Sequence, residues 1–130
     1  MSTIERVTKL SLPADQFVVI GSGVLDALKL REAGDVDLIV TPVLFQSLKE
    51  AGWESKTKYD EEYLEKGDVE VWLSWGSVDR MPNFNELFND SVTIEGVRFA
   101  NPRFVINWKK QRASEKDLKD IALLEEYLRG

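Results

Sequence analysis

FVVIGSGVLDALKLREAGDVDLIV, residues 17–40, is the stretch that decides the predicted fold. Residues 17–20 form a short unbroken apolar run, which is typical of a strand buried on both faces. Two glycines and a serine follow at once, at residues 21–23. Residues 24–32 carry apolar side chains at helical spacing, and a glycine two residues later could end that helix. Residues 36–40 then predict a second buried strand.

The flanking sequence adds helices and hairpins. Before the last helix, the expected elements are a helix before Pro13, a helix from Pro42 to Gly52, a strand over 53–59, hairpins turning at 66–67 and 95–96, a loop over 76–83, a short helix over 84–88 and a helix over 102–112. A capping box at Ser114 then begins the last helix. The inner face of this helix is expected to carry Leu118, Ile121, Leu124 and Leu128. This order predicts an α+β fold, with a mixed sheet and helices packed mainly on one face.

Composition excludes several kinds of chemistry. The chain has 130 residues, which favours a single domain over 1–130, with a core over about 17–100 and a helical tail over about 101–130. It has no cysteine and no histidine, so thiolate nucleophiles, imidazole bases and Cys-based metal sites are absent. Carboxylates, hydroxyls, amines and backbone groups remain. The metals that suit carboxylates are hard cations such as magnesium, manganese and calcium.

Charge and hydropathy restrict the partners. The net charge of −6 makes an extended nucleic-acid surface unexpected, although a nucleotide bound through a metal is compatible with it. No stretch approaches the ~20 apolar residues needed to cross a bilayer, and no secretory signal is visible at the start. These features, with the missing cysteines, predict a cytoplasmic protein.

Asp35 and Asp37 are the first candidate site residues. Residues two apart in a strand point the same way, so the two carboxylates are expected side by side at the start of an apolar strand. Like charges held together repel unless a cation intervenes, and such a pair is a good ligand for a divalent metal. The alternative is a solvated strand end, where acids are common.

Gly21, Ser22 and Gly23 are the second candidate, between a buried strand and a helix. Glycine lets the backbone approach a ligand closely, and a helix start offers free N–H groups to phosphate. The alternative is a tight turn. The spacing matches neither a Rossmann fingerprint nor a P-loop.

A third acidic feature opens the strand expected near residue 69. Asp68 and Glu70 share a face, and Glu70 lies between two valines, a costly place for a carboxylate without a role. Either could be the third carboxylate of a site, and Glu70 is favoured because of its apolar neighbours. The alternative is a hairpin strand with one polar face.

In combination, these features resemble the nucleotidyltransferase superfamily whose members are similar to DNA polymerase β. The pattern reads Ile20-Gly21-Ser22, 12 intervening residues, Asp35-Val36-Asp37-Leu38, and Val69-Glu70-Val71. The tail WKKQRASEKDLKDIALLEEYL, residues 108–128, resembles the helical tail of small stand-alone members through Lys109, Arg112, Lys116, Asp117, Asp120 and Ile121. The resemblance spans about residues 17–128. Glu70 stands where Asp is more usual.

The resemblance implies a transfer of a nucleoside monophosphate from a nucleoside triphosphate, such as ATP, to a hydroxyl acceptor. Asp35, Asp37 and Glu70 would be the catalytic residues and would hold Mg²⁺ or Mn²⁺. Gly21, Ser22 and Gly23 would hold the triphosphate, and Lys109, Arg112 or Lys116 could neutralise its charge. The alternative for these cations is a solvated helix face paired with neighbouring acids.

Two other interpretations stay open. The chain could keep the fold as a catalytically weak or inactive binding module, an antitoxin-like or regulatory partner, because it is small and acidic and its third carboxylate is unusual. Small members often act with a protein partner or as oligomers. The acids could also be a solvated strand edge in an unrelated α+β fold. The tryptophans at 53, 72, 75 and 108 are expected mostly in the core.

Overall fold

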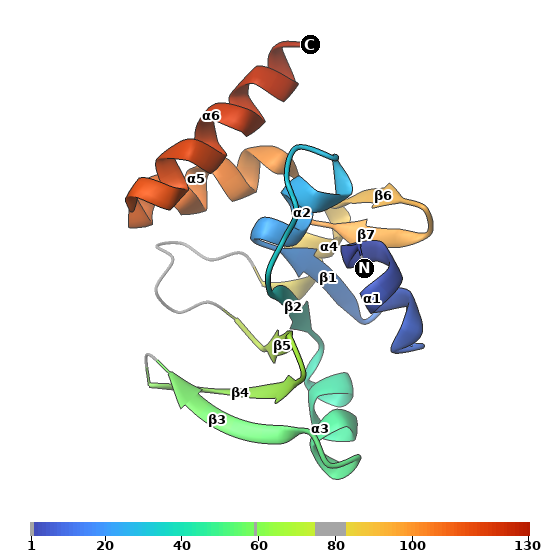
Figure 1. The fold of residues 1–130 in the computed structure, drawn as a ribbon. Helices are drawn as coiled ribbons and strands as arrows, with labels where there is room; N and C mark the ends of the chain where they lie inside the picture. The colour runs from blue at the N-terminus through green and yellow to red at the C-terminus, as the bar shows by residue number, and fades with distance from the viewer. Residues whose placement is uncertain (1, 59, 75–82) are drawn as a thin grey trace.

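A computed structural model describes residues 2–58, 60–74 and 83–130 of the chain. Within these residues a mixed sheet runs in the order β3-β4-β5-β2-β1-β7-β6 (Figure 1). The strands are β1 Phe17–Ile20, β2 Val36–Val40, β3 Glu54–Lys58, β4 Glu61–Lys66, β5 Val69–Trp72, β6 Val92–Ile94 and β7 Val97–Phe99. The helices are α1 Thr3–Lys9, α2 Ser22–Ala27, α3 Pro42–Glu50, α4 Phe84–Asn89, α5 Pro102–Arg112 and α6 Glu115–Arg129. The α+β class predicted from the sequence is confirmed.

The two strands predicted from residues 17–40 lie at the centre of the sheet. β1 pairs antiparallel with β2, while β2 pairs parallel with β5 and β1 pairs parallel with β7. Every residue of β1 is buried, and β2 is buried except at Asp37, which is partly exposed. The unbroken apolar runs therefore mark central strands that are covered on both faces. This is typical of strands that have a parallel neighbour, as β1 has in β7 and β2 has in β5.

The helix predicted over 24–32 is wrong at both ends. α2 begins at Ser22 and ends at Ala27. It closes in a Schellman motif, in which the N–H of Leu30 donates to Leu25 O at 2.9 Å and the N–H of Lys29 donates to Asp26 O at 2.9 Å. Lys29 takes the left-handed conformation, with φ of 61°. Apolar spacing was misleading because Leu30 packs on the core from outside the helix.

Other elements confirm the local signals. α3 has Thr41 as its N-cap and Pro42 in its first turn, and α5 covers the predicted range. A capping box joins Ser114 and Asp117 at the start of α6, with Asp in place of the usual Glu. Both predicted hairpins form, and the turn between β6 and β7 places Glu95 and its neighbouring glycine at positive φ.

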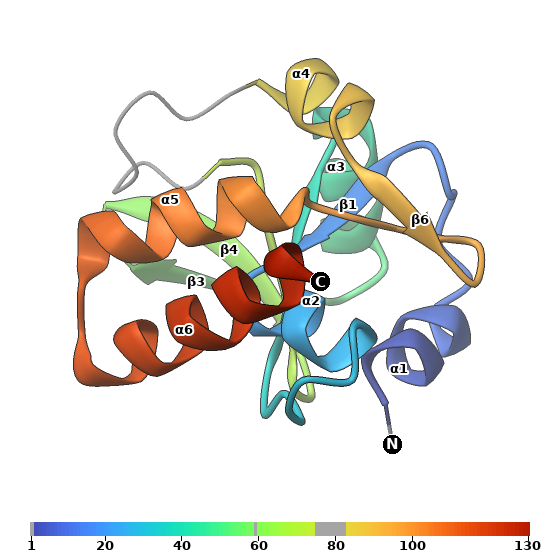
Figure 2. The same ribbon diagram turned by 90° about the horizontal axis from the view of Figure 1, so that it is seen from above.

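α5 and α6 lie side by side as an antiparallel hairpin at one end of the sheet (Figure 2). The predicted inner face of α6 is only half correct. Ile121 and Leu124 are buried, but Leu118 is 57% exposed and Leu128 is 36% exposed. The buried polar residues of α6 are two acids instead, Asp117 and Asp120. Apolar spacing alone could not show that α6 turns its carboxylates inward.

Three sequence predictions fall partly or wholly outside the described residues. These are the end of the strand at Tyr59, the loop over 76–83, and the burial of Trp75. The other three tryptophans, at 53, 72 and 108, are buried as predicted. In the part of the chain that the structure describes, no helix is long and apolar enough to cross a membrane.

Gly23 is required by close packing between α2 and β1. A Cβ atom added at Gly23 would lie 2.7 Å from Val19 Cγ1 and 3.2 Å from Thr3 Cγ2. We therefore expect Gly23→Ala to lower the free energy of unfolding by about 1–3 kcal/mol through overpacking, as measured by chemical denaturation.

The matched control is Gly34→Ala. An added Cβ there meets nothing within 4 Å, and Gly34 does not have a positive φ. We expect this control to be neutral or slightly stabilising. Equal losses in the two variants would contradict the packing explanation.

Candidate functional site

The predicted acids meet where β2 and β5 run parallel. Asp37 and Glu70 are direct partners in the register of the two strands, so their side chains project from the same face of the sheet. Asp37 also lies opposite Ile20, the last residue of β1. Both acids are partly exposed, which leaves them open to a ligand.

Asp35 lies just before β2, beside the first turn of α2. The hydroxyl of Ser22 donates to the main-chain oxygen of Asp35 at 3.5 Å. This contact brings the segment after β1 against the start of β2, so Ser22 and Asp35 approach each other although they are 13 residues apart in the chain. The side chain of Asp35 is exposed.

Electrostatics link the three carboxylates. The pKa of Asp37 is raised to about 7, first by burial and then by the negative charges of Glu70 and Asp35, while Lys58 and Arg112 act in the opposite direction. The pKa of Glu70 is also raised, first by burial and in part by Asp35. The three acids therefore form one repelling group, and the nearby cations do not offset its cost fully.

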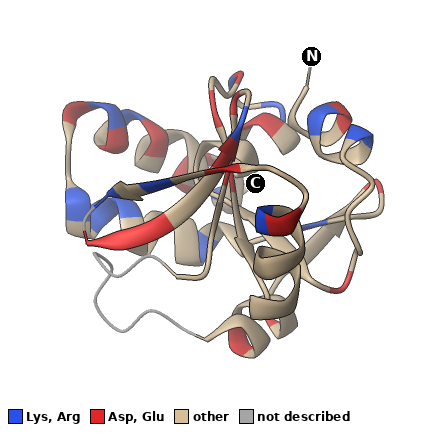
Figure 3. Ribbon diagram, turned by 90° about the horizontal axis from the view of Figure 1, so that it is seen from below, with Lys and Arg blue, Asp and Glu red and all other residues tan. Residues whose placement is uncertain are grey.

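Charges of both signs surround this group on the hairpin of β3 and β4. Glu65 is the register partner of Glu70, and it accepts a bond from Lys56 Nζ at 3.1 Å. Figure 3 shows Lys and Arg interspersed with Asp and Glu on this side of the molecule. The local field at Glu70 therefore depends on the hairpin as well as on β2.

Asp68 lies apart from this group, in the turn before β5. Its carboxylate pairs with Arg6 Nη1 at 2.6 Å and its side chain is 49% exposed. Its main-chain oxygen accepts from Val36 N at 2.9 Å, which starts the parallel pairing of β2 with β5. The structure thus brings Glu70, and not Asp68, beside Asp37.

Arg6 of α1 fixes the segment that leads into Asp35. Its guanidinium donates to Ala33 O and to Gly34 O, each at 2.7 Å, in addition to Asp68. Asp26 of α2 supports the same segment by accepting from Ala33 N at 3.0 Å. Sequence reasoning did not find Arg6, because its partners are main-chain oxygens about 27 residues away.

The predicted glycines have different roles. Gly21 is the N-cap of α2, with φ of 67° and no side-chain cap, a conformation that favours glycine. Gly23 is buried and turned toward Val19, so its lack of a side chain serves packing. The N–H of Val24 donates to Gly21 O at 3.1 Å, within the first turn of α2.

The predicted cations of the tail lie on α5 and α6. Lys109 is buried, with Nζ 3.0 Å from Asp120 Oδ2 and 3.5 Å from Asp117 Oδ1. Arg112 makes a two-point contact with Asp117, at 2.8 Å and 2.7 Å. Lys116 is exposed. Lys109 and Arg112 are thus paired with neighbouring acids, as the alternative raised from the sequence expects, but Lys109 is buried and does not lie on a solvated helix face. Arg112 is also close enough to lower the pKa of Asp37.

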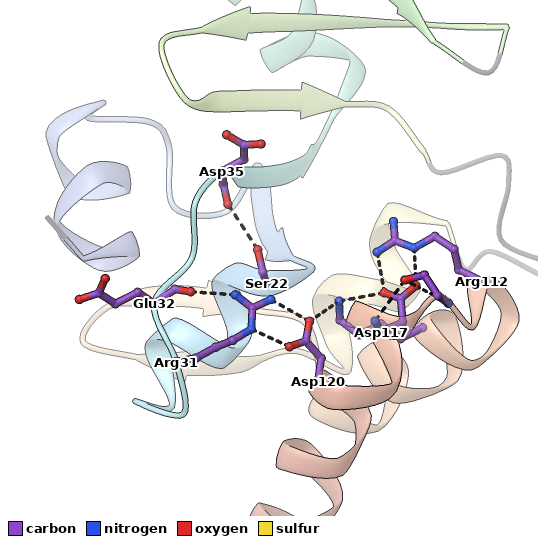
Figure 4. A network of polar contacts seen from close by, with 9 residues as sticks. Ser22, Arg31, Glu32, Asp35, Arg112, Asp117 and Asp120 are labelled. Atoms are coloured by element: carbon purple, nitrogen blue, oxygen red, sulfur yellow. Dashed lines mark hydrogen bonds and ion pairs between the residues drawn. The ribbon is translucent and has the colours of Figure 1, made fainter.

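A further cation, Arg31, completes this network (Figure 4). Arg31 donates to both oxygens of Asp120, at 2.6 Å and 2.7 Å. The pairing lowers the pKa of Asp120 and raises that of Arg31, against the effect of burial. Sequence reasoning named Asp120 but missed Arg31, because the two residues are 89 positions apart and only the fold joins them.

Carboxylate oxygens are the side-chain groups at this site that suit a divalent metal such as magnesium. Asp37 and Glu70, two neighbouring carboxylates whose pKa values are raised, offer the oxygen ligands that a hard cation favours. In the described residues no group of three or more acids is gathered closely enough to enclose a metal ion alone.

Comparisons with known proteins gave one likeness of fold. No family model matches the chain, and no curated protein matches it. The structure is similar to the crystal structure of an antigenic nucleotidyltransferase-like protein from Paracoccidioides brasiliensis, with a TM-score of 0.47 and 14% sequence identity. The match covers 94% of this chain and 72% of the other chain. A likeness at this level concerns the arrangement of helices and strands and does not extend to individual residues.

The raised pKa of Asp37 predicts how stability depends on pH. Its value rises from 3.8 to about 7 on folding, so between about pH 4 and pH 7 the folded chain keeps a proton that the unfolded chain has lost. The contribution of Asp37 to stability therefore falls as pH rises through this window. At pH 8 we expect Asp37→Asn to raise the free energy of unfolding by up to about 4 kcal/mol, and at pH 4 to have little effect.

Urea denaturation of the wild type and the variant at both pH values measures this effect. Asp15→Asn, at an exposed turn residue, is the control and should show no such pH-dependent gain. A loss of stability at pH 8 in Asp37→Asn would contradict the repulsion described above.

Proposed function

We propose that the protein binds a nucleoside triphosphate with Mg²⁺ or Mn²⁺ at Asp35, Asp37 and Glu70 and transfers a nucleoside monophosphate to a hydroxyl acceptor. The observation that carries the proposal is the register of β2 with β5, which sets Asp37 beside Glu70, with Asp35 coupled to both. The sequence pattern from Ile20 to Val71 supports the same function by its resemblance to nucleotidyltransferases.

The residues divide into three roles. Asp35 and Asp37 would be metal ligands, and Glu70 would complete the site on the acceptor side. Ser22 would turn its hydroxyl from the main-chain oxygen of Asp35 to the triphosphate, together with N–H groups at the start of α2. When bound, the metal supplies charge neutralisation for the attacking and leaving oxygens.

The chemistry of the transfer balances with these groups alone. The acceptor oxygen attacks the α-phosphorus, a new P–O bond forms, and the bond from the α-phosphorus to the bridging oxygen breaks to release pyrophosphate. The hydroxyl proton passes to a carboxylate, for which Glu70 is the candidate base. A raised pKa suits a carboxylate to this role near neutral pH.

The test of this proposal is metal-dependent binding of a triphosphate, which is detected as a change in thermal unfolding. Each of the four common triphosphates is compared with and without Mg²⁺. We expect at least one of them to stabilise the wild type only when the metal is present. At 100 times its dissociation constant, the triphosphate should raise the free energy of unfolding by about 2.7 kcal/mol. Asp35→Asn, Asp37→Asn and Glu70→Gln should lose this stabilisation, each measured against its own baseline.

Asp68→Asn is the matched control. Asp68 is an acid directly before β5, the strand that carries Glu70, but its carboxylate pairs with Arg6. It should keep the metal-dependent stabilisation. A wild type that responds to no triphosphate would overturn the proposal, and loss in Asp68→Asn with retention in Glu70→Gln would assign the third carboxylate to Asp68.

Turnover separates an enzyme from a binding module of the same fold. Labelled triphosphate, Mg²⁺ and cell lysate should give a labelled acceptor with the wild type and none with Asp37→Asn. Binding without any labelled acceptor would favour the non-catalytic alternative.

A further inference from the structure

We infer that Arg31 and Asp120 are positioning residues for the triphosphate site, holding the α5–α6 hairpin against the segment that leads into Asp35. This inference rests on the proposed function. Arg31 lies four residues before Asp35, in the connection between α2 and β2, and Asp120 lies in the middle of α6. Their pairing is therefore a direct link between the two parts of the chain.

The geometry of the pair is that of a fixed link. The guanidinium of Arg31 donates from Nε to Asp120 Oδ1 at 2.6 Å and from Nη2 to Asp120 Oδ2 at 2.7 Å. Its Nη1 donates to Glu32 O at 2.7 Å, which ties the same side chain to its own segment. The Asp120 side chain is 2% exposed and that of Arg31 is 25% exposed. Two parallel bonds restrict both distance and orientation.

The link continues along the hairpin to a residue near the carboxylates. Asp120 also accepts from Lys109, which in turn contacts Asp117, the partner of Arg112. The guanidinium of Arg112 lies over the ring of Trp108, 4.4 Å from its centroid. Arg112 is thus held from two sides, by Asp117 and by Trp108, and Lys109 joins Asp117 to Asp120, the partner of Arg31.

Stability alone does not explain such a network. Burying several charges costs desolvation energy, and apolar residues of similar size often stabilise a fold as well or better. The gain from this arrangement is a defined position for two groups, the Asp35 segment and Arg112. Both belong to the surroundings of Asp37, so the network acts where a triphosphate with its metal would bind.

The test compares five variants with wild type by their dissociation constants for the triphosphate that binds wild type most tightly with Mg²⁺. Arg31→Met removes the guanidinium and its bonds to Asp120 but keeps an unbranched side chain of similar aliphatic length. We expect it to weaken binding about tenfold or more, as loss of groups that orient metal ligands does. Arg31→Lys keeps the charge and one bond, and should recover much of the affinity.

The matched control is Lys110→Met, which breaks an exposed pair with Glu125, at 3.9 Å, between the same two helices. It should leave affinity unchanged. The double variant Arg31→Met with Asp120→Asn should lose no more than Asp120→Asn alone, because removal of Asp120 already breaks the link to Arg31. Binding is measured at a temperature at which thermal unfolding shows every variant to be folded. If Asp120→Asn, a substitution at a buried residue, does not fold, the comparison of Arg31→Met with wild type remains the test.

The outcomes separate the two claims. Wild type that binds no triphosphate overturns the proposed function, and this inference with it. Wild type that binds, with Arg31→Met binding equally well, overturns the positioning role alone. Equal losses in Arg31→Met, Arg31→Lys and Lys110→Met would also overturn it, because the effect would then be general to the hairpin.

Discussion

The parallel pairing of β2 with β5 is the constraint on which the rest of the molecule depends. It sets Asp37 beside Glu70, each the one acid in an otherwise apolar strand. Burial and repulsion make this arrangement costly for the folded chain, and the pKa of Asp37 rises to about 7 as a result. A chain that tolerates such a cost at one point has a place where a bound cation would lower its free energy.

The positive side chains that surround this point fix the backbone. Arg6 holds the segment before Asp35 through two main-chain oxygens and also holds the turn before β5 through Asp68. Arg31 ties the same segment to α6 from another side. The start of β2 is therefore fixed by two guanidinium groups. Precise placement of acids that repel one another requires this kind of external restraint, since their own interaction drives them apart.

Much of the fold was predictable, since it depends on local signals. Unbroken apolar runs marked β1 and β2, and Thr41 and Ser114 marked the starts of α3 and α6. The pairing of Asp37 with Glu70 was expected only through the family resemblance, because nothing local indicates that β2 and β5 are neighbours. The end of α2 could not be predicted, because Lys29 adopts a conformation more typical of glycine.

Long-range ion pairs were the least predictable part of the candidate site. Residues such as Arg31 and Asp120 carry no signal of their pairing in a single sequence, and the apolar spacing of α6 pointed toward Leu118 and away from its buried acids. Tertiary contacts decide which of many charged residues are paired. The sequence could name Lys109 and Arg112 as cations of interest, but only the fold shows which carboxylates they contact.

Paramagnetic broadening by Mn²⁺ tests the central claim most directly, because it locates a bound cation without requiring turnover. With a triphosphate present and Mn²⁺ added at a small fraction of the protein concentration, the side-chain carboxylate signals of Asp35, Asp37 and Glu70 should broaden first. Broadening falls steeply with distance from Mn²⁺, so the signals of Asp117 and Asp120, which are paired with cations of the α5–α6 hairpin and of the connection before β2, should broaden less. Broadening centred on other acids, with Asp37 and Glu70 unaffected, would contradict the account.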